Sequence, residues 1–303
     1  MKKEIKTYST EAFRERFMKA EPRLDSLLKA DFDTFFIVRV EEMIRLMKLP
    51  VPPTRSTSHT FIYLTAGEAV MSIGSETYTI YQNEGLFVPA GQVFSFSNAD
   101  INQGYLCHFH HDFAVGKFGS PEGLNAFEFL KVWGNLRVRF DPITAQYVVH
   151  GLARMLTEYS EHGLRRVDLL RAYWVALLYE VDGVYEPPSL DSRSRSVSLT
   201  HRFRELLVAN VTTHHRVTDY AAALNITPNH LNKVVKQTTG KSPTRWIDEA
   251  LVIEAKVLLY QTNFTIGEVA VEVGILDPSY FSRLFKKYEG ITPLQFRHRI
   301  KTF

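Results

Sequence analysis

The sequence predicts a multidomain fold: an N-terminal β-barrel that carries a helical hairpin, followed by an all-α C-terminal domain with two helix-turn-helix units. Three observations support this fold class. Short apolar segments separated by glycines occupy residues 59–110, two apolar stripes with helical spacing follow, and one helix-turn-helix pattern is written twice near the C-terminus. The chain has 303 residues, enough for two domains that each bury a core.

The expected barrel strands begin after a polar N-terminal segment. We expect residues 1–30 to form a mobile arm with a short helix over 10–19, and residues 32–41 (FDTFFIVRVE) to form the first strand. Residues 49–58 contain Pro50, Pro52 and Pro53, so we expect no regular structure there. The remaining strands are expected at 59–65, 69–73, 76–81, 85–88, 93–97 and 104–110, with turns at Gly67, Gly74, Gly85 and Gly91.

Residues 85–98 (GLFVPAGQVFSFSN) resemble the second motif of the cupin barrels, with Gly85, Pro89, Gly91 and Asn98 in step. The resemblance implies a concave, largely apolar interior that can hold a small molecule. A metal-binding cupin has histidine where this chain has Phe94. In the first motif only His59 remains, with Phe61 and Thr65 where a second histidine and a glutamate would stand. One surviving ligand cannot build a three- or four-ligand site, so we expect no metal, no cofactor and no metal-dependent reaction.

Five side chains are candidates for binding a small-molecule effector, on their position in the sequence alone. Each could instead be a core side chain of a filled barrel, and the sequence leaves that alternative open. The five candidates are His59, Tyr63, Phe94, Phe96 and His108.

The cluster CHFHHDF, residues 107–113, also invites a metal-site hypothesis. Strand alternation places Cys107, Phe109 and His111 on one face and His108 and His110 on the other. Two histidines at i and i+2 bind a metal only if a third ligand arrives from elsewhere, so an ordinary strand end is the favoured interpretation. No local feature argues for a lowered pKa of the Cys107 thiol or for its use as a nucleophile.

After an expected loop at 113–123, the apolar residues take helical spacing. Two stripes, separated by Gly163, predict a helical hairpin that packs on the barrel. The first stripe contains Ile143, Tyr147, Val148, Leu152, Met155, Leu156 and Tyr159, and the second contains Val167, Leu170, Trp174, Leu177, Leu178 and Val181. Residues 186–196 (EPPSLDSRSRS) hold two prolines and four serines and are expected to form an interdomain linker, which gives domains at 1–185 and 197–303.

The repeated pattern reads VTDYAAALNITPNHLNKVVKQTTGKSP over 217–243 and TIGEVAVEVGILDPSYFSRLFKKYEGITP over 265–293. Six residues of the first copy match residues 50 positions later, although the second turn is one residue longer. The matched residues are Pro228, Leu231, Lys233, Lys236, Gly240 and Pro243, with Pro278, Phe281, Arg283, Lys286, Gly290 and Pro293. The helix-turn-helix units are expected at 217–237 and 265–287, with further helices at 199–211, 243–260 and 293–300.

The apolar spacing in each copy directs a set of polar side chains outward. In the second copy Phe281, Leu284 and Phe285 form one stripe, which leaves Arg283 and Lys286 facing away from the core. Asn, Arg, Lys and Ser side chains can bond base edges or phosphates. One copy alone is equally well explained as a helical hairpin with a solvated basic face, but two copies at a fixed offset favour DNA binding. Residues 197–303 hold 14 Lys and Arg against 9 Asp and Glu, whereas the rest of the chain holds 22 against 24. This positive charge favours nucleic acid as the partner without selecting a sequence.

Residues 199–303 resemble the DNA-binding domain of the AraC/XylS family of bacterial transcription regulators, most specifically through DPSYFSRLFKKYEGITPLQFR (277–297). Ile275 departs from the family, which usually carries Phe there. The resemblance implies two helix-turn-helix units bridged by a long helix, whose recognition helices enter successive major grooves. By motif position, the DNA-binding residues are Thr227, Asn229, Asn232 and Lys233 in the first unit, and Ser279, Tyr280, Ser282 and Arg283 in the second. Lys236, Lys286 and Lys287 complete the expected DNA-binding set.

The same resemblance implies a transcription regulator, such as an activator, that binds double-stranded DNA, a small-molecule effector and RNA polymerase, and that forms a homodimer through residues 143–181. The single cysteine excludes an internal disulfide, and the N-terminus has Glu4 and Lys6 where a signal peptide needs an apolar core. No stretch reaches membrane-spanning length, so we expect a cytoplasmic protein. The alternatives to an effector-responsive regulator are a cupin-type enzyme, a DNA-repair protein with a similar DNA-binding domain, a regulator without an effector, and an architectural DNA-binding protein.

Overall fold

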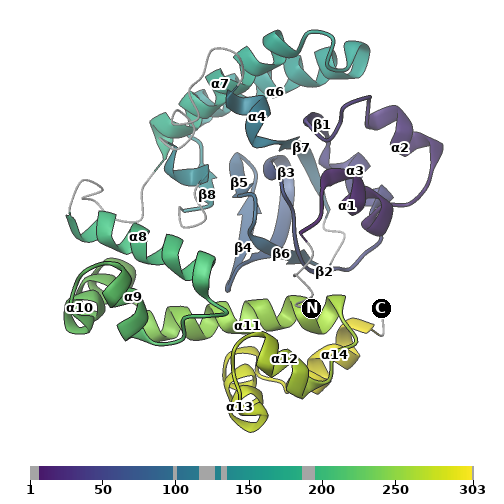
Figure 1. The fold of residues 1–303 in the computed structure, drawn as a ribbon. Helices are drawn as coiled ribbons and strands as arrows, with labels where there is room; N and C mark the ends of the chain where they lie inside the picture. The colour runs from purple at the N-terminus through teal and green to yellow at the C-terminus, as the bar shows by residue number, and fades with distance from the viewer. Residues whose placement is uncertain (1–6, 98–100, 116–126, 131–134, 186–194, 302–303) are drawn as a thin grey trace. The chain divides into compact units, whose positions relative to one another are not determined.

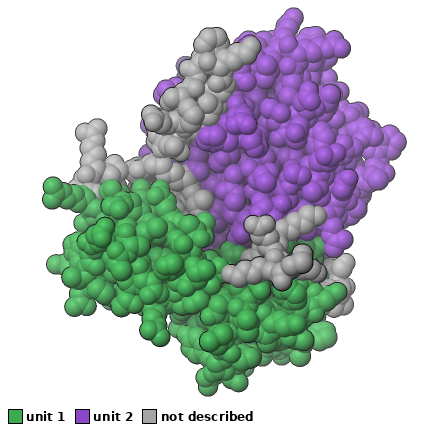
Figure 2. All heavy atoms as spheres, viewed as in Figure 1, with its two compact units in different colours: residues 1–6, 187–303 green, residues 7–186 purple. Residues whose placement is uncertain are grey.

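The computed structural model describes all residues except 1–6, 98–100, 116–126, 131–134, 186–194 and 302–303. The chain separates into two compact units, of which one holds residues 7–186 and the other residues 187–303 (Figure 2). The expected linker lies outside the described residues up to 194, and residues 195 and 196 already belong to a helix. Asn98 of the cupin-like segment and most of the expected 113–123 loop also lie outside them.

The N-terminal segment is folded from residue 7 onward, so the expectation of a mobile arm over residues 7–30 was wrong. It forms α1 (Thr10–Phe17) and α2 (Pro22–Leu27) (Figure 1). Ser9 caps α1 by accepting a hydrogen bond from the Ala12 amide. Phe17 and Leu24 are buried, so the few apolar residues of this polar stretch attach it to the domain.

The first strand is shorter than expected because a helix follows it directly. Strand β1 spans Phe35–Arg39 and α3 spans Val40–Leu46. Val40, Met43 and Met47 are buried at positions i, i+3 and i+7, which is the spacing of an amphipathic helix. The sequence therefore contained a signal for α3 that the strand assignment overlooked.

The proline-rich segment is a strand, which corrects the prediction of no regular structure at 49–58. Strand β2 (Val51–Arg55) pairs with β6 (Val93–Phe96) and with no other described strand. The pairing is irregular between Val51 and Thr54, where Pro52 and Pro53 lie. Prolines lack the donor that a ladder requires, and an edge strand with an irregular register tolerates them.

One long strand connects the two parts of the sheet. Strand β3 (His59–Ile73) covers two of the expected strands and pairs first with β7 (Asn102–Phe109) and β5 (Glu84–Val88), and then with β4 (Glu76–Tyr81) and β6. Its register shifts between Leu64 and Ala66, and Gly67 has a φ of 80° inside the strand. Gly67 and Gly85 therefore lie in strands instead of turns, whereas Gly74 and Gly91 lie in turns with positive φ. The resulting sheet-rich fold is consistent with a barrel, and the cupin assignment stays a prediction.

A prediction concerns Gly104, which lies opposite the irregular part of β3. A Cβ atom at Gly104 would lie 2.0 Å from the Tyr63 carbonyl oxygen, so Gly104→Ala should lower the free energy of unfolding by about 1–3 kcal/mol. In Gly151→Ala the new Cβ meets no atom within 4 Å and lies within a helix, so this control should gain about 0.5–1 kcal/mol. Urea denaturation followed by circular dichroism measures both, and equal effects would contradict the steric argument.

Two long helices follow the sheet, as expected. Helix α4 (His111–Val115), a short 3-10 turn η1 (Glu128–Leu130) and β8 (Arg137–Arg139) lead to α6 (Pro142–His162) and α7 (Val167–Val184). The ring of Trp174 in α7 packs on Phe109, with 4.5 Å between centroids, and also on Phe61, so α7 covers one face of the sheet. Ile143 and Tyr147 are 66% and 61% exposed, so the buried stripe of α6 is narrower than expected.

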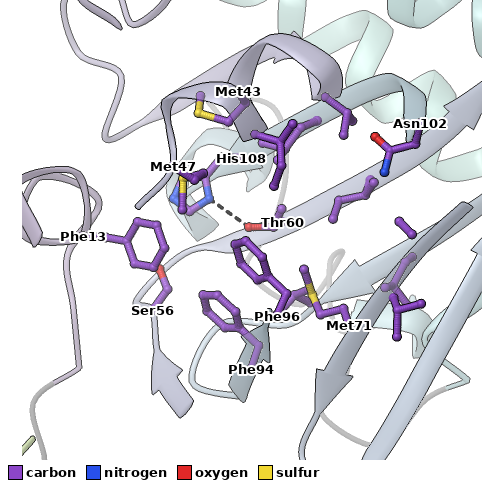
Figure 3. A pocket seen from close by; sticks show the side chains of 18 of the residues that line it. Phe13, Met43, Met47, Ser56, Thr60, Met71, Phe94, Phe96, Asn102 and His108 are labelled. Carbon is purple, nitrogen blue, oxygen red and sulfur yellow. Dashed lines mark hydrogen bonds between the residues drawn. The ribbon is translucent and has the colours of Figure 1, made fainter. Parts of the chain in front are cut away.

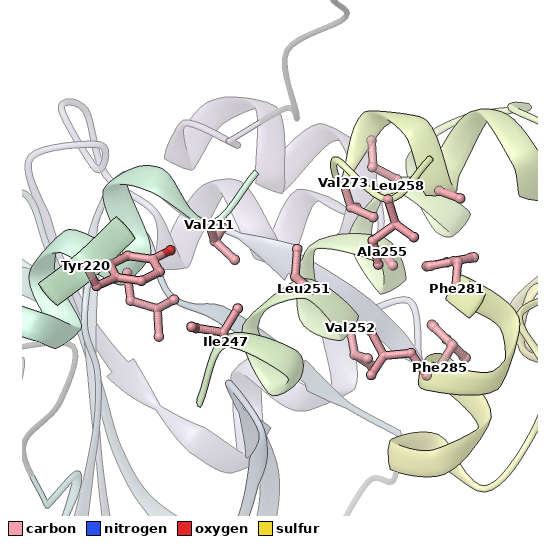
Figure 4. Close-up of a cluster of buried hydrophobic side chains, with 14 of the residues drawn as sticks. Val211, Tyr220, Ile247, Leu251, Val252, Ala255, Leu258, Val273, Phe281 and Phe285 are labelled. Carbon is pink, nitrogen blue, oxygen red and sulfur yellow. The ribbon is translucent and has the colours of Figure 1, made fainter. Parts of the chain in front are cut away.

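The C-terminal unit is helical throughout its described part. It comprises α8 (Arg195–Asn210), α9 (Val217–Ala223), α10 (Pro228–Thr239), α11 (Pro243–Gln261), α12 (Ile266–Glu272), α13 (Pro278–Glu289) and α14 (Pro293–Lys301). Its core runs along α11, with Tyr220 at one end and Phe281 and Phe285 at the other (Figure 4). Across both units, none of the described helices combines the length and apolarity needed to cross a membrane.

Candidate nucleic-acid interface and small-molecule cavity

Capping residues next to its apolar stripe set both ends of helix α10. The Thr227 hydroxyl accepts a hydrogen bond from the His230 amide at 3.2 Å, and Pro228 occupies the first turn. Gly240 ends the helix in the left-handed region with a φ of 71°. Leu231, Val234 and Val235 are buried, so the opposite face of α10 is exposed to solvent.

Helix α13 repeats this construction 50 residues later. The Asp277 carboxylate caps the helix by accepting from the Ser279 amide at 2.8 Å, and Pro278 follows it. Gly290 ends the helix with a φ of 75°. The buried side chains are Phe281, Leu284 and Phe285, at the positions of Leu231, Val234 and Val235 in the first unit.

The exposed faces of α10 and α13 also correspond position by position. Five pairs with the 50-residue offset are exposed in both helices: Asn229 and Ser279, His230 and Tyr280, Lys233 and Arg283, Lys236 and Lys286, and Gln237 and Lys287. Asn232 and Ser282 are half-buried. Each face therefore carries amide, hydroxyl or imidazole groups beside two or more cations, which suits a groove lined by bases and phosphates.

Three of the predicted DNA-binding residues already make contacts within the domain. The Thr227 hydroxyl serves as the cap, and the Asn232 amide donates to the Pro228 carbonyl at 3.1 Å. The Lys287 ammonium lies 3.7 Å from the Asp248 carboxylate and 4.9 Å from the centre of the Tyr288 ring. These three residues consequently have less freedom to meet a ligand than Lys233 or Arg283.

Two exposed residues, His230 and Gln237, were missing from the sequence-based set. Both lie on the same face of α10 as Lys233. The signal that could have identified them is the 50-residue offset, because their counterparts Tyr280 and Lys287 were in the predicted set.

Helix α11 joins the two helix-turn-helix units through part-buried contacts at both of its ends. On the first unit, the Trp246 indole donates to the Thr239 hydroxyl at 3.1 Å. On the second, the Tyr288 hydroxyl donates to the Asp248 carboxylate at 2.9 Å, and the Lys256 ammonium pairs with Glu289 at 3.0 Å. A continuous helix with core contacts at both ends fixes the separation of α10 and α13.

The second candidate site is a cavity of about 120 Å³ inside the N-terminal unit (Figure 3). Helices α1 and α3 supply Phe13 and Met43 to its wall, and Met47 follows directly after α3. Strands β3 and β7 supply Thr60 and His108. Of the predicted effector-binding residues, Phe94, Phe96 and His108 line this cavity. Their role in binding an effector stays a prediction.

His59 and Tyr63, the other two predicted effector-binding residues, do not line this cavity. His59 stacks on Phe109 with 5.0 Å between ring centroids, and its Nδ1 accepts from the Ala90 amide. The Tyr63 hydroxyl donates to Asn83 at 3.2 Å. Side chains alternate along β3, so these odd-numbered residues face away from the cavity while Thr60 and Ile62, which the sequence analysis missed, face into it.

His108 connects three segments through a buried hydrogen-bond network. Its Nδ1 lies 2.9 Å from the Thr60 hydroxyl and its Nε2 lies 3.0 Å from the Thr10 hydroxyl of α1. Burial lowers the pKa of His108 to about 3, with smaller contributions from His59 and His110. The imidazole is therefore neutral near pH 7, and it donates through one nitrogen and accepts through the other.

Because of these shifts, we expect the N-terminal unit to lose stability as the pH falls below about 6.5. Burial also lowers the pKa of His59, to about 4, while the ordinary histidine pKa is 6.5. Between the ordinary pKa and the pKa in the folded protein, the unfolded chain binds more protons than the folded chain. The stability that each neutral, buried histidine contributes is therefore fully present above pH 6.5 and is lost as the pH falls toward 4 for His59 and toward 3 for His108. Each histidine should cost up to about 1.4 kcal/mol per pH unit.

Urea denaturation at pH 7.5 and pH 5.0 measures this loss. His108→Gln should reduce the difference between the two pH values, whereas His230→Gln, at an exposed position of α10, should leave it unchanged. An unchanged difference in His108→Gln would show that His108 is not the group responsible.

The other histidines of the 107–113 cluster do not converge. Strand β7 ends at Phe109, so His111 begins α4, and His110 pairs with Asp112 at 3.2 Å. Within the described ranges no group of three or more His, Cys, Asp and Glu side chains could hold a metal ion. Cys107 is fully buried, and burial raises the pKa of its thiol well above the ordinary value.

Comparisons with known proteins find a family match within the helical unit and relatives whose likeness covers different shares of the chain. Residues 220–299 match the model of a family described as a helix-turn-helix domain. The chain is 30% identical over 139 residues to the arabinose operon regulatory protein of Salmonella typhimurium, which covers 46% of this chain and 47% of that protein. It is 40% identical over 74 residues to the bifunctional transcriptional activator/DNA repair enzyme AdaA of Bacillus subtilis, covering 24% of this chain and 35% of AdaA.

Among solved structures, ToxT of Vibrio cholerae with bound unsaturated fatty acid matches 87% of this chain and 95% of its own, at 15% identity and a TM-score of 0.41. The chain spans less than half the length of the two sequence relatives named above.

Proposed function

We propose that the chain is a sequence-specific, DNA-binding transcription regulator whose C-terminal domain is of the AraC/XylS type. The match of residues 220–299 to a helix-turn-helix domain family and the likeness to the arabinose operon regulatory protein support this. One observation supports the proposal above the others: α10 and α13 have N-caps, C-cap glycines, buried residues and exposed residues at corresponding positions. Two such helices joined by α11 suit two successive major grooves on one face of a duplex.

The expected DNA site has two short elements for each subunit. Successive major grooves on one face of B-DNA lie roughly 34 Å apart, and the 19 residues of α11 extend about 28 Å. Selection of bound fragments from a random duplex pool, followed by footprinting, tests this. For each bound subunit we expect two protected elements about one helical turn apart. A full chain that ignores duplex DNA at low ionic strength, or that protects a single element, would refute the proposal.

The N-terminal unit is proposed to bind a small-molecule effector in its cavity. The internal space beside Phe94, Phe96 and His108 supports this over a regulator without an effector, because a filled barrel would leave no room for a ligand. A ligand changes DNA affinity only if it binds the DNA-competent and incompetent arrangements with different affinities. Transcription in vitro with purified RNA polymerase, with and without ligand, distinguishes activation from repression.

A homodimer through residues 143–181 is part of the proposal. The exposed apolar side chains of Ile143 and Tyr147, one turn apart on α6, support it. Tyr147→Glu should shift the chain from dimer to monomer in sedimentation velocity, because a buried charge without a partner opposes association. The matched variant Ser160→Glu, at an exposed position on another face of α6, should stay dimeric. A monomeric wild-type chain would contradict this part of the proposal.

We propose a regulator without catalytic activity. A repair methyltransferase needs an accessible thiolate, whereas Cys107 is buried on β7 with a raised pKa. Mass spectrometry after exposure to alkylated DNA should therefore show no transfer to Cys107. An alkylated Cys107 would favour the repair-protein alternative.

A further inference from the structure

The wall of the cavity limits the chemical class of its ligand. Sixteen of the twenty lining residues are apolar, and four of these are methionines and four are phenylalanines. Among the described residues that line the cavity, none is a lysine, arginine, aspartate or glutamate. A ligand charge placed here would lose its hydration without gaining an ion-pair partner, so the wall favours an uncharged molecule.

All four polar side chains that line the cavity make a hydrogen bond, but one of them, Asn102, keeps an oxygen atom without a partner. Thr60 and His108 bond to each other, and the Ser56 hydroxyl accepts from the Ser58 amide at 3.2 Å. The fourth is Asn102, whose Nδ2 donates to the Glu68 carbonyl at 3.0 Å. This bond fixes the orientation of the amide and leaves its Oδ1, which is buried and has no partner in the described structure.

Oδ1 of Asn102 can accept a hydrogen bond from a ligand. An unmade bond at a buried acceptor is costly, and a hydroxyl or N–H group of a ligand would remove that cost. Asn102 and His108 lie six residues apart on the same strand, about 20 Å along it, so the open acceptor lies far from the polar network of His108 (Figure 3). Apolar side chains, among them Leu106 and Met71, line the space between.

We propose that this cavity binds an uncharged, elongated and largely apolar molecule whose hydroxyl or N–H group donates a hydrogen bond to Oδ1 of Asn102. The proposal rests on the proposed effector function and names the ligand class for that site. Methionine side chains adapt to different shapes, so the cavity selects for the absence of charge and the presence of one donor more than for an outline.

Displacement of a neutral fluorescent reporter, N-phenyl-1-naphthylamine, from the full-length chain tests the proposal with three compounds of one chain length. Decan-1-ol is neutral with a donor, decyl methyl ether is neutral without one, and decanoate is charged. We expect the alcohol to displace the reporter at concentrations about ten-fold lower than the ether and at least ten-fold lower than decanoate.

Two leucine variants on the same strand identify the acceptor. Asn102→Leu should abolish the difference between alcohol and ether, whereas Gln103→Leu, at an exposed position on the opposite face of β7, should preserve it. Thermal unfolding of both variants shows whether the fold is intact. An Asn102→Leu protein that unfolds would be replaced by Asn102→Ala, for which the same loss of discrimination is expected.

The proposal is overturned if decanoate binds as tightly as the alcohol, if alcohol and ether bind alike in the wild type, if discrimination survives in the folded Asn102 variant, or if no compound displaces the reporter. Fluorescence anisotropy of a labelled duplex with the same preparations separates the two proposals. Retained DNA binding with failed displacement refutes only the ligand class, and lost DNA binding refutes the regulator function whatever the cavity binds.

Discussion

Replacing Phe285 with alanine should lower the free energy of unfolding of the C-terminal domain by about 3–5 kcal/mol, because the change deletes a fully buried ring. Phe285 packs on Phe281 and Phe296, with ring centroids 6.0 and 5.5 Å away, and so joins α13 to α14. Urea denaturation followed by ellipticity measures the loss, and hydrogen exchange of α12 to α14 shows which domain unfolds.

The control for Phe285→Ala is Tyr280→Ala on the same helix. The Tyr280 side chain is 48% exposed, so its removal should change stability by no more than about 0.5 kcal/mol. Equal losses in the two variants would show that the core of this unit does not depend on the Phe285 ring.

The double variant Lys233→Ala and Arg283→Ala should lose about 2–6 kcal/mol of affinity for the selected site, from about 1–3 kcal/mol for each base contact. The two losses should add, because the residues lie on separate helices, α10 and α13. Titration of a labelled duplex by fluorescence anisotropy measures the loss, and Arg283→Ala alone should relax the preference at one base pair.

Lys236→Ala provides the contrast for the base-reading variants. If Lys236 meets a phosphate, its removal should weaken binding to all sequences alike and reduce the salt slope by about 1. Arg283→Ala, by comparison, should affect the selected site more than random DNA. Equal losses on both DNAs would refute a base-reading role for Arg283.

The helices of the C-terminal domain were predictable because their signals are local. The caps Thr227 and Asp277 and the glycines Gly240 and Gly290 lie next to the apolar stripes of α10 and α13. Helices α11 and α14 begin at the expected Pro243 and Pro293. Strand β2 and helix α3 were missed for the opposite reason. Whether Pro52 disrupts a strand depends on the neighbours of that strand, and the apolar spacing of α3 continues directly from β1.

The cavity was only partly predictable because both faces of its sheet are buried. Strand alternation separates His59 and Tyr63 from Thr60, but it does not reveal which set faces helix α7 and which faces the cavity. Composition predicted an apolar interior, whereas the open acceptor of Asn102 depends on a tertiary contact with Glu68.

The uninterrupted helix α11 has a consequence for the spacing of the DNA sites expected from the proposed function. A single base-pair insertion between the two elements of a site would move the second element by about 3.4 Å and turn it by about 35° around the duplex axis. The connector cannot stretch or twist to follow, since its buried side chains hold both units. DNA sites of the proposed regulator should therefore tolerate exchanges of individual bases far more readily than insertions or deletions between their two elements.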